Sequence, residues 1–321
     1  MRAFTPPKPH HWEWPTLAVL AGCYIVYLLV TWTAADLGPV LSLALLSVTL
    51  ALHSSLQHEV IHGHPFGRTT RDALLVFPPI GLFVPYQRFR DTHLAHHQDA
   101  NLTDPYDDPE TKYMDLLVLR RMPLALQYLF RLNNTLSGRM LVGPVIGFSH
   151  FYFNDGKRII RGDKQVARAY VSHFLGLVIV FFWLANYATM SIGMYILAAY
   201  IGMSILKIRT FLEHQANESA SGRTAIVDDR GPLAWLFLYN NFHSVHHLHP
   251  RLPWYRLPSF FDKHRARLLT RNNHYYYASY GEVFRQYLLW EKDSVAHPLW
   301  SISNRTMPIE IPTSKRPETK P

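Results

Sequence analysis

The sequence lacks basic residues over two long stretches. It contains 32 Lys and Arg among 321 residues, yet none of them lies in residues 9–67 or 169–206. Basic residues favour the cytoplasmic side of a membrane and are excluded from its apolar interior. The pattern therefore excludes an ordinary soluble domain. It predicts an integral membrane protein whose polar parts lie together on the cytoplasmic side.

Cysteine is nearly absent, since Cys23 is the single one and lies within an apolar run. One cysteine excludes an internal disulfide, an iron–sulfur cluster and a thiolate metal site. The net charge of +9 is not accompanied by a recognisable nucleic-acid-binding module. We therefore expect no nucleic-acid partner and assign the basic residues to the face of a membrane.

Four apolar runs are long enough to cross a bilayer, which takes about 20 residues each. We expect them at about residues 15–34, 37–57, 169–189 and 192–212. The predicted fold class is an all-α integral membrane protein with four transmembrane helices. Residues 58–168 and 213–300 then form one cytosolic helical cap, within a single domain of residues 1–300. Residues 301–321 are polar and proline-rich, and we expect a disordered tail.

Three shorter segments of the cap are expected at the membrane surface. Residues 73–85 are apolar but too short to span, and their prolines favour a re-entrant or interfacial segment. Residues 116–132 form an amphipathic pattern typical of a surface helix. Residues 140–153 are apolar but carry Gly143, Pro144 and Gly147, which predict a broken interfacial segment. None of the three changes the number of crossings.

Histidine is what the cap has in abundance, with 19 in the chain. Residues 93–97 and 243–247 each read H-x-x-H-H, and residues 58–62 read H-x-x-x-H. On a helix, positions i, i+3 and i+4 share one face, so three imidazoles can close on a metal. His214 follows the fourth run. With four spans all nine fall on one side: His58, His62, His93, His96, His97, His214, His243, His246 and His247.

A single pair of histidines at this spacing is more often structural, but three such groups indicate metal binding. Imidazole suits Zn, Cu, Fe and Ni, and nine imidazoles exceed the four ligands of one tetrahedral zinc. They suit two metals with open positions. The neighbours His53, His64 and His249 are left out of the ligand set, and His173 is assigned to packing inside the third span.

The loop of residues 101–110 is acidic and rich in turn-forming residues. It is either a solvated loop or a source of carboxylates for the imidazoles. Metal-bound imidazoles commonly donate their second N–H to a carboxylate. The candidates for that contact are Asp104, Asp107 and Asp108.

The three boxes, HEVIH, HLAHH and HSVHH, resemble those of the membrane fatty-acid desaturase and hydroxylase superfamily. Residues 253–255 (Pro-Trp-Tyr), after the third box, are similar to bacterial acyl desaturases in particular. The resemblance implies a centre of two Fe ions held by the nine histidines, with His214 as the ligand outside the boxes. It implies an oxidoreductase that uses O2 and two electrons to attack an unactivated C–H bond.

The resemblance also implies the surroundings of the enzyme. The chain shows no haem or ferredoxin domain, so we expect a separate electron donor of ferredoxin or cytochrome b5 type. The substrate is expected to be an acyl-lipid or acyl-carrier chain reached from the lipid bilayer, and the product a double bond. The expected location is a bacterial inner membrane, with the active site on the cytoplasmic side.

Three alternatives stay open. An acyl-lipid hydroxylase and a carotenoid ketolase or hydroxylase share the same boxes. A histidine-rich membrane metal transporter is the rival outside enzymes. Transporters place their ligands near the bilayer midplane, whereas these histidines map to its edge.

Overall fold

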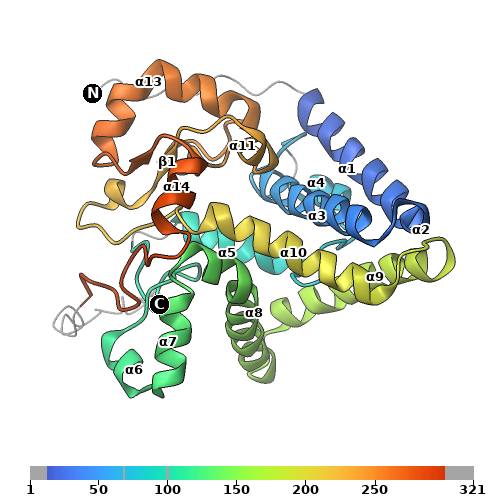
Figure 1. Cartoon of the computed structure of the whole chain (residues 1–321), viewed down its shortest axis with the longest axis horizontal. Coiled ribbons are helices and arrows are strands. Elements are labelled where there is room, and N and C mark those ends of the chain that lie inside the picture. Colours follow the sequence, from blue (N-terminus) through green and yellow to red (C-terminus); the bar gives the residue numbers. More distant parts are fainter. Residues whose placement is uncertain (1–12, 68, 99–100, 301–321) are drawn as a thin grey trace, which may run out of the picture.

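A computed structural model describes residues 13–67, 69–98 and 101–300 of the chain. Four helices in it are long and apolar enough to cross a membrane: α1 (Trp14–Trp32), α3 (Pro39–Ile61), α9 (Lys164–Asn186) and α10 (Ile192–Thr210). Helices α1 and α10 both pack against α3, and all four project from one end of the molecule (Figure 1). The four predicted spans are thus confirmed to within a few residues. The expected tail, residues 301–321, lies outside the described residues.

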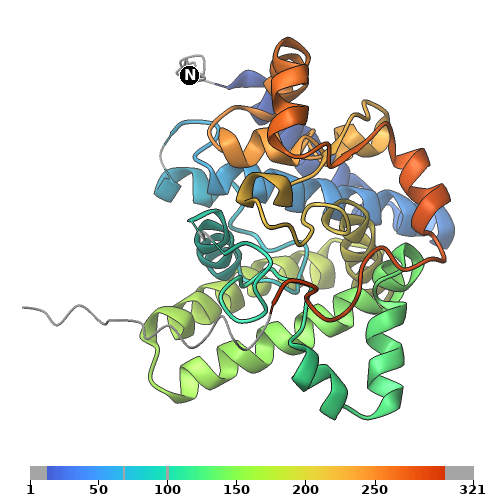
Figure 2. The ribbon, with the colours of Figure 1, turned by 90° about the vertical axis from the view of Figure 1, so that its left-hand side faces the viewer.

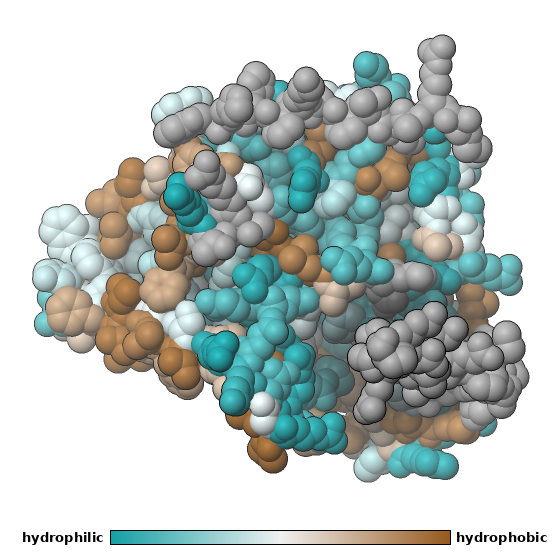
Figure 3. Space-filling view, turned by 180° about the vertical axis from the view of Figure 1, so that it is seen from behind, coloured by the Kyte–Doolittle hydropathy of each residue, from teal (hydrophilic) through white to brown (hydrophobic). Residues whose placement is uncertain are grey.

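Large apolar side chains stand outward on the projecting helices. On α9 the side chains of Phe174, Leu175 and Val178 are each more than half exposed. From behind, hydrophobic residues gather on the projecting end among residues of intermediate hydropathy, while the strongly hydrophilic ones lie mainly over the cap (Figure 3). A monomeric soluble protein rarely exposes an apolar surface of this kind, so the surface indicates contact with lipid.

Helices α3 and α10 approach closely because Gly202 leaves room between them. A Cβ at Gly202 would lie 3.0 Å from the Ser47 carbonyl oxygen and 3.2 Å from Leu50 Cβ. Small residues permit such approaches between membrane helices. At the far end, the expected tight turn is a single helical turn, α2 (Ala34–Leu37), which ends at Gly38 with φ 77°. Thr189 Oγ1 accepts from Ala35 N at 2.9 Å, so both inter-span links lie at that end.

Residues 76–85 follow α4 (Thr69–Leu75) and have no regular secondary structure. Side chains of the spans satisfy the carbonyls in and next to this segment. The donors are Tyr24 to Leu75 (2.8 Å), His173 to Leu82 (2.8 Å) and Tyr195 to Ile80 (2.6 Å). Irregular backbone is tolerated at membrane depth only where protein buries it. These contacts with α1, α9 and α10 favour the re-entrant interpretation of the segment.

The remaining elements gather at one end of the spans and form the cap, which faces the viewer in Figure 2. Beside α4, it contains α5 (Tyr86–Gln98), α6 (Leu116–Arg121), α7 (Leu124–Leu132), α8 (Leu136–Ile160), η1 (Ala220–Arg223), α11 (Pro232–Leu236), α12 (His243–Leu248), η2 (Trp254–Arg256), α13 (Leu257–Arg271) and α14 (Tyr280–Tyr287). Strands β1 (Ile226–Val227) and β2 (Tyr276–Tyr277) pair in parallel. They are two residues long, so the fold remains essentially all-α.

Two expectations about the cap were wrong in detail. Residues 116–132 form two helices, because Pro123 holds the preceding Met122 in an extended conformation (ψ 149°). Conversely, α8 runs unbroken through residues 140–153 and contains Pro144. The helix lies against α10, and the Tyr200 hydroxyl of α10 donates to the carbonyl of Leu141, three residues before Pro144. Tertiary packing thus overrides the local propensity to break.

Candidate metal centre

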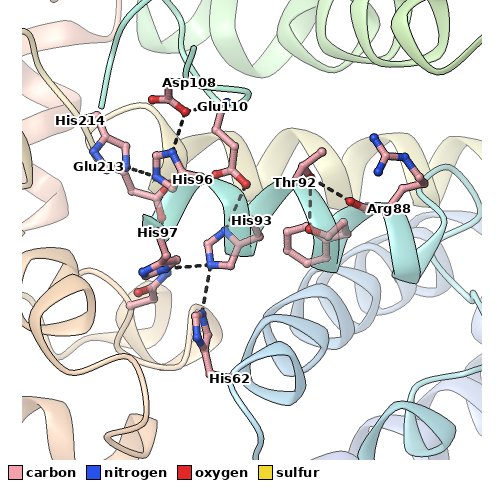
Figure 4. Close-up of polar contacts among 12 residues, drawn as sticks. His62, Arg88, Thr92, His93, His96, His97, Asp108, Glu110, Glu213 and His214 are labelled. Carbon is pink, nitrogen blue, oxygen red and sulfur yellow. Dashed lines mark hydrogen bonds and ion pairs between the residues drawn. The ribbon is translucent and has the colours of Figure 1, made fainter. Parts of the chain in front are cut away.

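The structure brings all nine predicted histidines together in two groups. The first consists of His58, His62, His93, His97 and His246, and the second of His96, His214, His243 and His247. Within each group, the candidate ligand atoms lie within 4.8 Å of one another. The residues come from the end of α3, from α5, from the segment after α10 and from α12. Figure 4 shows five of them, from His62 to His214.

Each H-x-x-H-H box divides between the two groups. On α5, His93 and His97 point to the first group and His96 to the second; on α12, His243 and His247 point to the second and His246 to the first. One residue turns a helix by about 100°, so positions i and i+4 lie about 40° apart while i+3 points elsewhere. The three imidazoles of one H-x-x-H-H box therefore do not close on one metal, since each of these two boxes contributes to both groups. The first box is not divided, because His58 and His62 both belong to the first group.

The imidazole nitrogens are spaced as ligands of a metal would be. In the first group, Nε2 of His93 lies 3.1 Å from Nε2 of both His62 and His97. In the second, Nε2 of His214 lies 2.9 Å from that of His96 and 3.0 Å from that of His243. Nitrogens bound about 2.1 Å from one ion at right angles to each other would be about 3.0 Å apart. The residues therefore fit ions with more than four coordination positions.

His58 supplies a second observation that points to a ligand. Its side chain is buried, and among the described residues its Nε2 has no hydrogen-bond partner. Its ring lies 4.5 Å from that of His93 and 4.7 Å from that of His246, centroid to centroid. A buried polar atom without a partner is costly, and a metal ion in the first group would satisfy it.

Side-chain oxygens outside the two groups lie at hydrogen-bonding distance from the Nδ1 atoms of three of the imidazoles. Asp108 Oδ1 lies 2.7 Å from His96 Nδ1, and Glu110 Oε1 lies 3.1 Å from His93 Nδ1 (Figure 4). A carboxylate at Nδ1 accepts a hydrogen bond from the N–H there, which keeps the proton on Nδ1 and leaves the Nε2 lone pair for a metal. Asn240 Oδ1 lies 3.4 Å from Nδ1 of His243 and plays the same part.

Of the three predicted carboxylates, Asp104 and Asp107 do not take this position. Asp104 Oδ1 accepts from the backbone of Tyr106 (2.8 Å) and Asp107 (3.2 Å), while Asp107 itself is exposed. Short acidic side chains commonly bond the backbone two or three residues ahead. Sequence reasoning missed Glu110 and Asn240. Glu110 belongs to the same acidic loop, and Asn240 precedes His243 by three residues.

Burial sets the charge of most of these imidazoles. It lowers the pKa of His97 to about 3, with the neighbouring His93 adding to the effect. Burial likewise lowers the pKa of His214, His246 and His247 well below the ordinary value. His96 differs, because Glu110 and Asp108 outweigh its burial and raise its pKa to about 9. Neutral imidazoles with free Nε2 lone pairs are the form that binds metals.

A buried ion pair positions α5. Arg88 makes two bonds of 2.8 Å to Asp155 of α8, and Tyr170 of α9 donates to the same carboxylate at 3.0 Å.

The histidines left out of the predicted ligand set have other partners: His53 lies 3.2 Å from Tyr24 Oη, His64 pairs with Glu13 at 2.7 Å, and His249 packs on Phe260.

The sequence model of fatty acid desaturases matches residues 31–279, a range that contains all nine histidines. The chain belongs to the fatty acid desaturase family. A β-carotene ketolase of Paracoccus sp. (strain N81106 / MBIC 01143) is 25% identical over 228 residues, which cover 68% of this chain and 76% of the ketolase. This desaturase-family protein is therefore an oxidoreductase of the superfamily that includes desaturases and ketolases.

A cavity lies next to the first histidine group. Its walls come from α3, α5, α10 and the segment of residues 79–84. Gln57, which precedes His58, and Phe89, whose ring lies 5.7 Å from that of His93, form part of its lining. At the other end it reaches Leu50, about two helical turns from Gln57 along α3, and Ala199 of α10. Most of the lining is apolar, as expected for a site that takes a lipid chain.

Proposed function

We propose that this protein is an O2-dependent di-iron desaturase that introduces a double bond into a fatty acyl chain of a lipid or carrier. The observation that supports it most directly is the apolar cavity between the spans, whose lining ends at Gln57 and Phe89, next to His58 and His93 of the first histidine group. Two iron ions held by the two groups would supply the oxidation of an unactivated C–H bond with O2 and two electrons. Iron fits nitrogen ligands of this kind.

The chain's own residues have three tasks in this proposal. The cavity between α3, α5 and α10 holds the acyl chain extended and presents one methylene to the histidines. Asp108 and Glu110 accept hydrogen bonds from the Nδ1–H groups of His96 and His93, which fixes the orientation of these rings and so the direction of their Nε2 atoms. Apolar walls such as Phe89 and Leu82 exclude water from the reacting carbon.

Residues 253–255 tie the third box to the first. Trp254 N donates to Glu59 Oε2 at 3.3 Å, and Trp254 Nε1 donates to Thr16 Oγ1 at 3.2 Å. Glu59 is adjacent to His58, so this contact holds η2, which follows α12 in the chain, against the end of α3. The similarity of this segment to bacterial acyl desaturases favours an acyl chain as the substrate.

Oxidation of a carotenoid ring is the second candidate. It is favoured by one observation, the similarity to the β-carotene ketolase. Hydroxylation of an acyl chain is a third outcome of the same chemistry. Desaturation and hydroxylation both begin with removal of one hydrogen, and a change of about 1.4 kcal/mol in the difference between the activation free energies of the two following steps alters the product ratio tenfold.

The experiment that separates these candidates uses a host that makes no unsaturated lipids and a second host that makes β-carotene. Gas chromatography of acyl methyl esters from the first host should show new monoenes or dienes. Hydroxy acids alone would support the hydroxylase. Oxygenated carotenoids in the second host, with unchanged acyl chains in the first, would replace the acyl proposal with the ketolase.

A further inference from the structure

Three polar side chains interrupt the apolar lining of the cavity, and all three come from one face of α3. They are His53, Ser54 and Gln57. Ser54 lies four residues before His58, which is about 6 Å along the helix axis. The polar patch therefore lies on the membrane-spanning helix α3 within about one and a half helical turns of His58, and its last member, Gln57, directly precedes that histidine.

Ser54 differs from the other hydroxyl residues of α3. Each of the others donates to the carbonyl four residues earlier, as Ser47 does to Leu43 (2.7 Å) and Ser55 to Ala51 (3.2 Å). The remaining two are Ser42 and Thr49. Within the described part of the chain, neither the Ser54 hydroxyl nor the Gln57 amide has a hydrogen-bond partner. Both side chains are only partly buried, and both line the cavity.

His53 is held in one orientation. The Tyr24 hydroxyl donates to the Leu75 carbonyl at 2.8 Å, so its lone pair is left for His53 Nε2 at 3.2 Å. His53 Nε2 therefore carries the proton, and Nδ1 is the acceptor of the neutral ring. The patch thus combines two groups that both donate and accept with one fixed acceptor.

An unsubstituted hydrocarbon chain leaves these groups without partners. In an apolar surrounding, an amide or hydroxyl without a hydrogen bond is costly. A hydroxyl group both donates and accepts, and so matches Ser54 and Gln57. We infer that the cavity recognises a chain that already carries a hydroxyl group, about one helical turn from the carbon presented to the histidines. A hydroxylation or hydration reaction must then act on the substrate before this enzyme does. This inference rests on the proposed function, in which the cavity holds the substrate chain.

Binding to the purified full-length protein tests the inference without turnover. Radiolabelled stearic acid is displaced by unlabelled stearic acid and, in turn, by each of its monohydroxylated positional isomers. We expect one isomer, or two neighbouring ones, to displace it at about tenfold lower concentration than stearic acid, which corresponds to one well-made hydrogen bond. Isomers with the hydroxyl elsewhere should bind no better than stearic acid.

Variants assign the preference to the patch. Ser54→Ala and Gln57→Leu should each reduce the preference for the favoured isomer to within about twofold of stearic acid, with iron content unchanged. Ser55→Ala is the matched control, because Ser55 does not line the cavity and its hydroxyl bonds Ala51. It should keep the full preference.

The possible failures are distinguishable. Equal affinity for stearic acid and every isomer overturns the inference and leaves the proposed desaturase intact. A preference that survives both Ser54→Ala and Gln57→Leu overturns it as well. If both variants bind every chain more tightly by the same factor, the patch holds water, and the inference is wrong. A protein that binds none of these chains also overturns the inference, while the acyl part of the proposed function is decided separately by the methyl esters of the expressing host.

Discussion

The rings of His97 and His247 stack on each other, with 4.1 Å between centroids and 17° between planes. His97 belongs to the first histidine group and His247 to the second, so the stack lies on the boundary between them. The two residues come from α5 and α12, which are far apart in sequence. The two groups are therefore in direct contact, and replacement of either ring should disturb the position of a ligand in the other group.

Replacement of any one of the nine histidines by Ala should abolish turnover. A change in the second group, such as His243→Ala, should lower bound iron from two ions per chain to one, because the first group keeps its five ligands. Iron analysis of the purified variants measures this. His150→Gln is the control, since His150 is exposed on α8 and bonds Asn154; it should keep both ions and its activity. Zinc in place of iron in the unmodified protein would refute the di-iron proposal.

Asp108→Asn should weaken metal binding in the second group. Asp108 accepts from His96 Nδ1 through one oxygen and from Thr103 N at 2.8 Å through the other. Loss of such a carboxylate typically costs 10- to 100-fold in metal affinity. Titration of metal-free protein with iron measures the change. Asp104→Asn in the same loop should have little effect, because the side chain of Asp104 accepts its hydrogen bonds from the backbone of its own turn, at Tyr106 and Asp107. Equal losses in both variants would show that the loop acts through folding alone.

The sequence was sufficient to predict the spans and the nine histidines, because both follow from local patterns. Hydrophobic runs report burial in lipid, and the boxes report helical spacing. The division of each H-x-x-H-H box between two groups was not predicted, since it depends on how α5 and α12 face each other. Asp108 and Asp104 look alike in sequence, and only the path of the loop brings Asp108 to His96. Likewise, the unbroken course of α8 through Pro144 depends on its packing against α10.

Gly176→Ala should destabilise the protein and disturb the cavity. A Cβ at this position of α9 would lie 2.5 Å from Pro79 Cδ, in the segment that forms one cavity wall. Overpacking of this kind costs about 1–3 kcal/mol. The midpoint temperature of thermal unfolding in detergent and the turnover rate should both fall. Gly193→Ala on α10 is the matched control, because a Cβ there meets nothing within 4 Å. An unaffected Gly176→Ala variant would argue against the observed position of residues 76–85.

Both inter-span links should lie on the face of the membrane opposite the histidines. Thr189 Oγ1 bonds Ala35 N at 2.9 Å, so the links meet at one end of the bundle. Reporter proteins fused after Asp36 and after Thr189 should both report the side of the membrane away from the cytoplasm. A reporter fused after Trp300, at the end of the cap, is the control and should report the cytoplasm. A cytoplasmic signal at either link would contradict the proposed orientation.

The electron donor should dock on α13. This helix exposes Lys263 and Arg271, and it packs behind α12, where the Phe261 ring lies 5.1 Å from that of Phe242, the neighbour of His243. A donor with an acidic face would be steered to this helix by charge and would reach the second histidine group from behind. Lys263→Glu combined with Arg271→Glu should slow turnover supported by a purified ferredoxin or cytochrome b5, chiefly through a higher KM for the donor. The difference from the unmodified protein should shrink as salt rises, because about 0.1 M salt screens charges beyond roughly 10 Å.

Arg120→Glu is the control, since α6 lies at the opposite edge of the cap (Figures 1 and 2). Turnover driven by a small chemical reductant should be equal in all three proteins, which separates donor docking from damage to the metal centre. If the α13 variant and the Arg120→Glu control respond alike to the protein donor, docking on α13 is wrong.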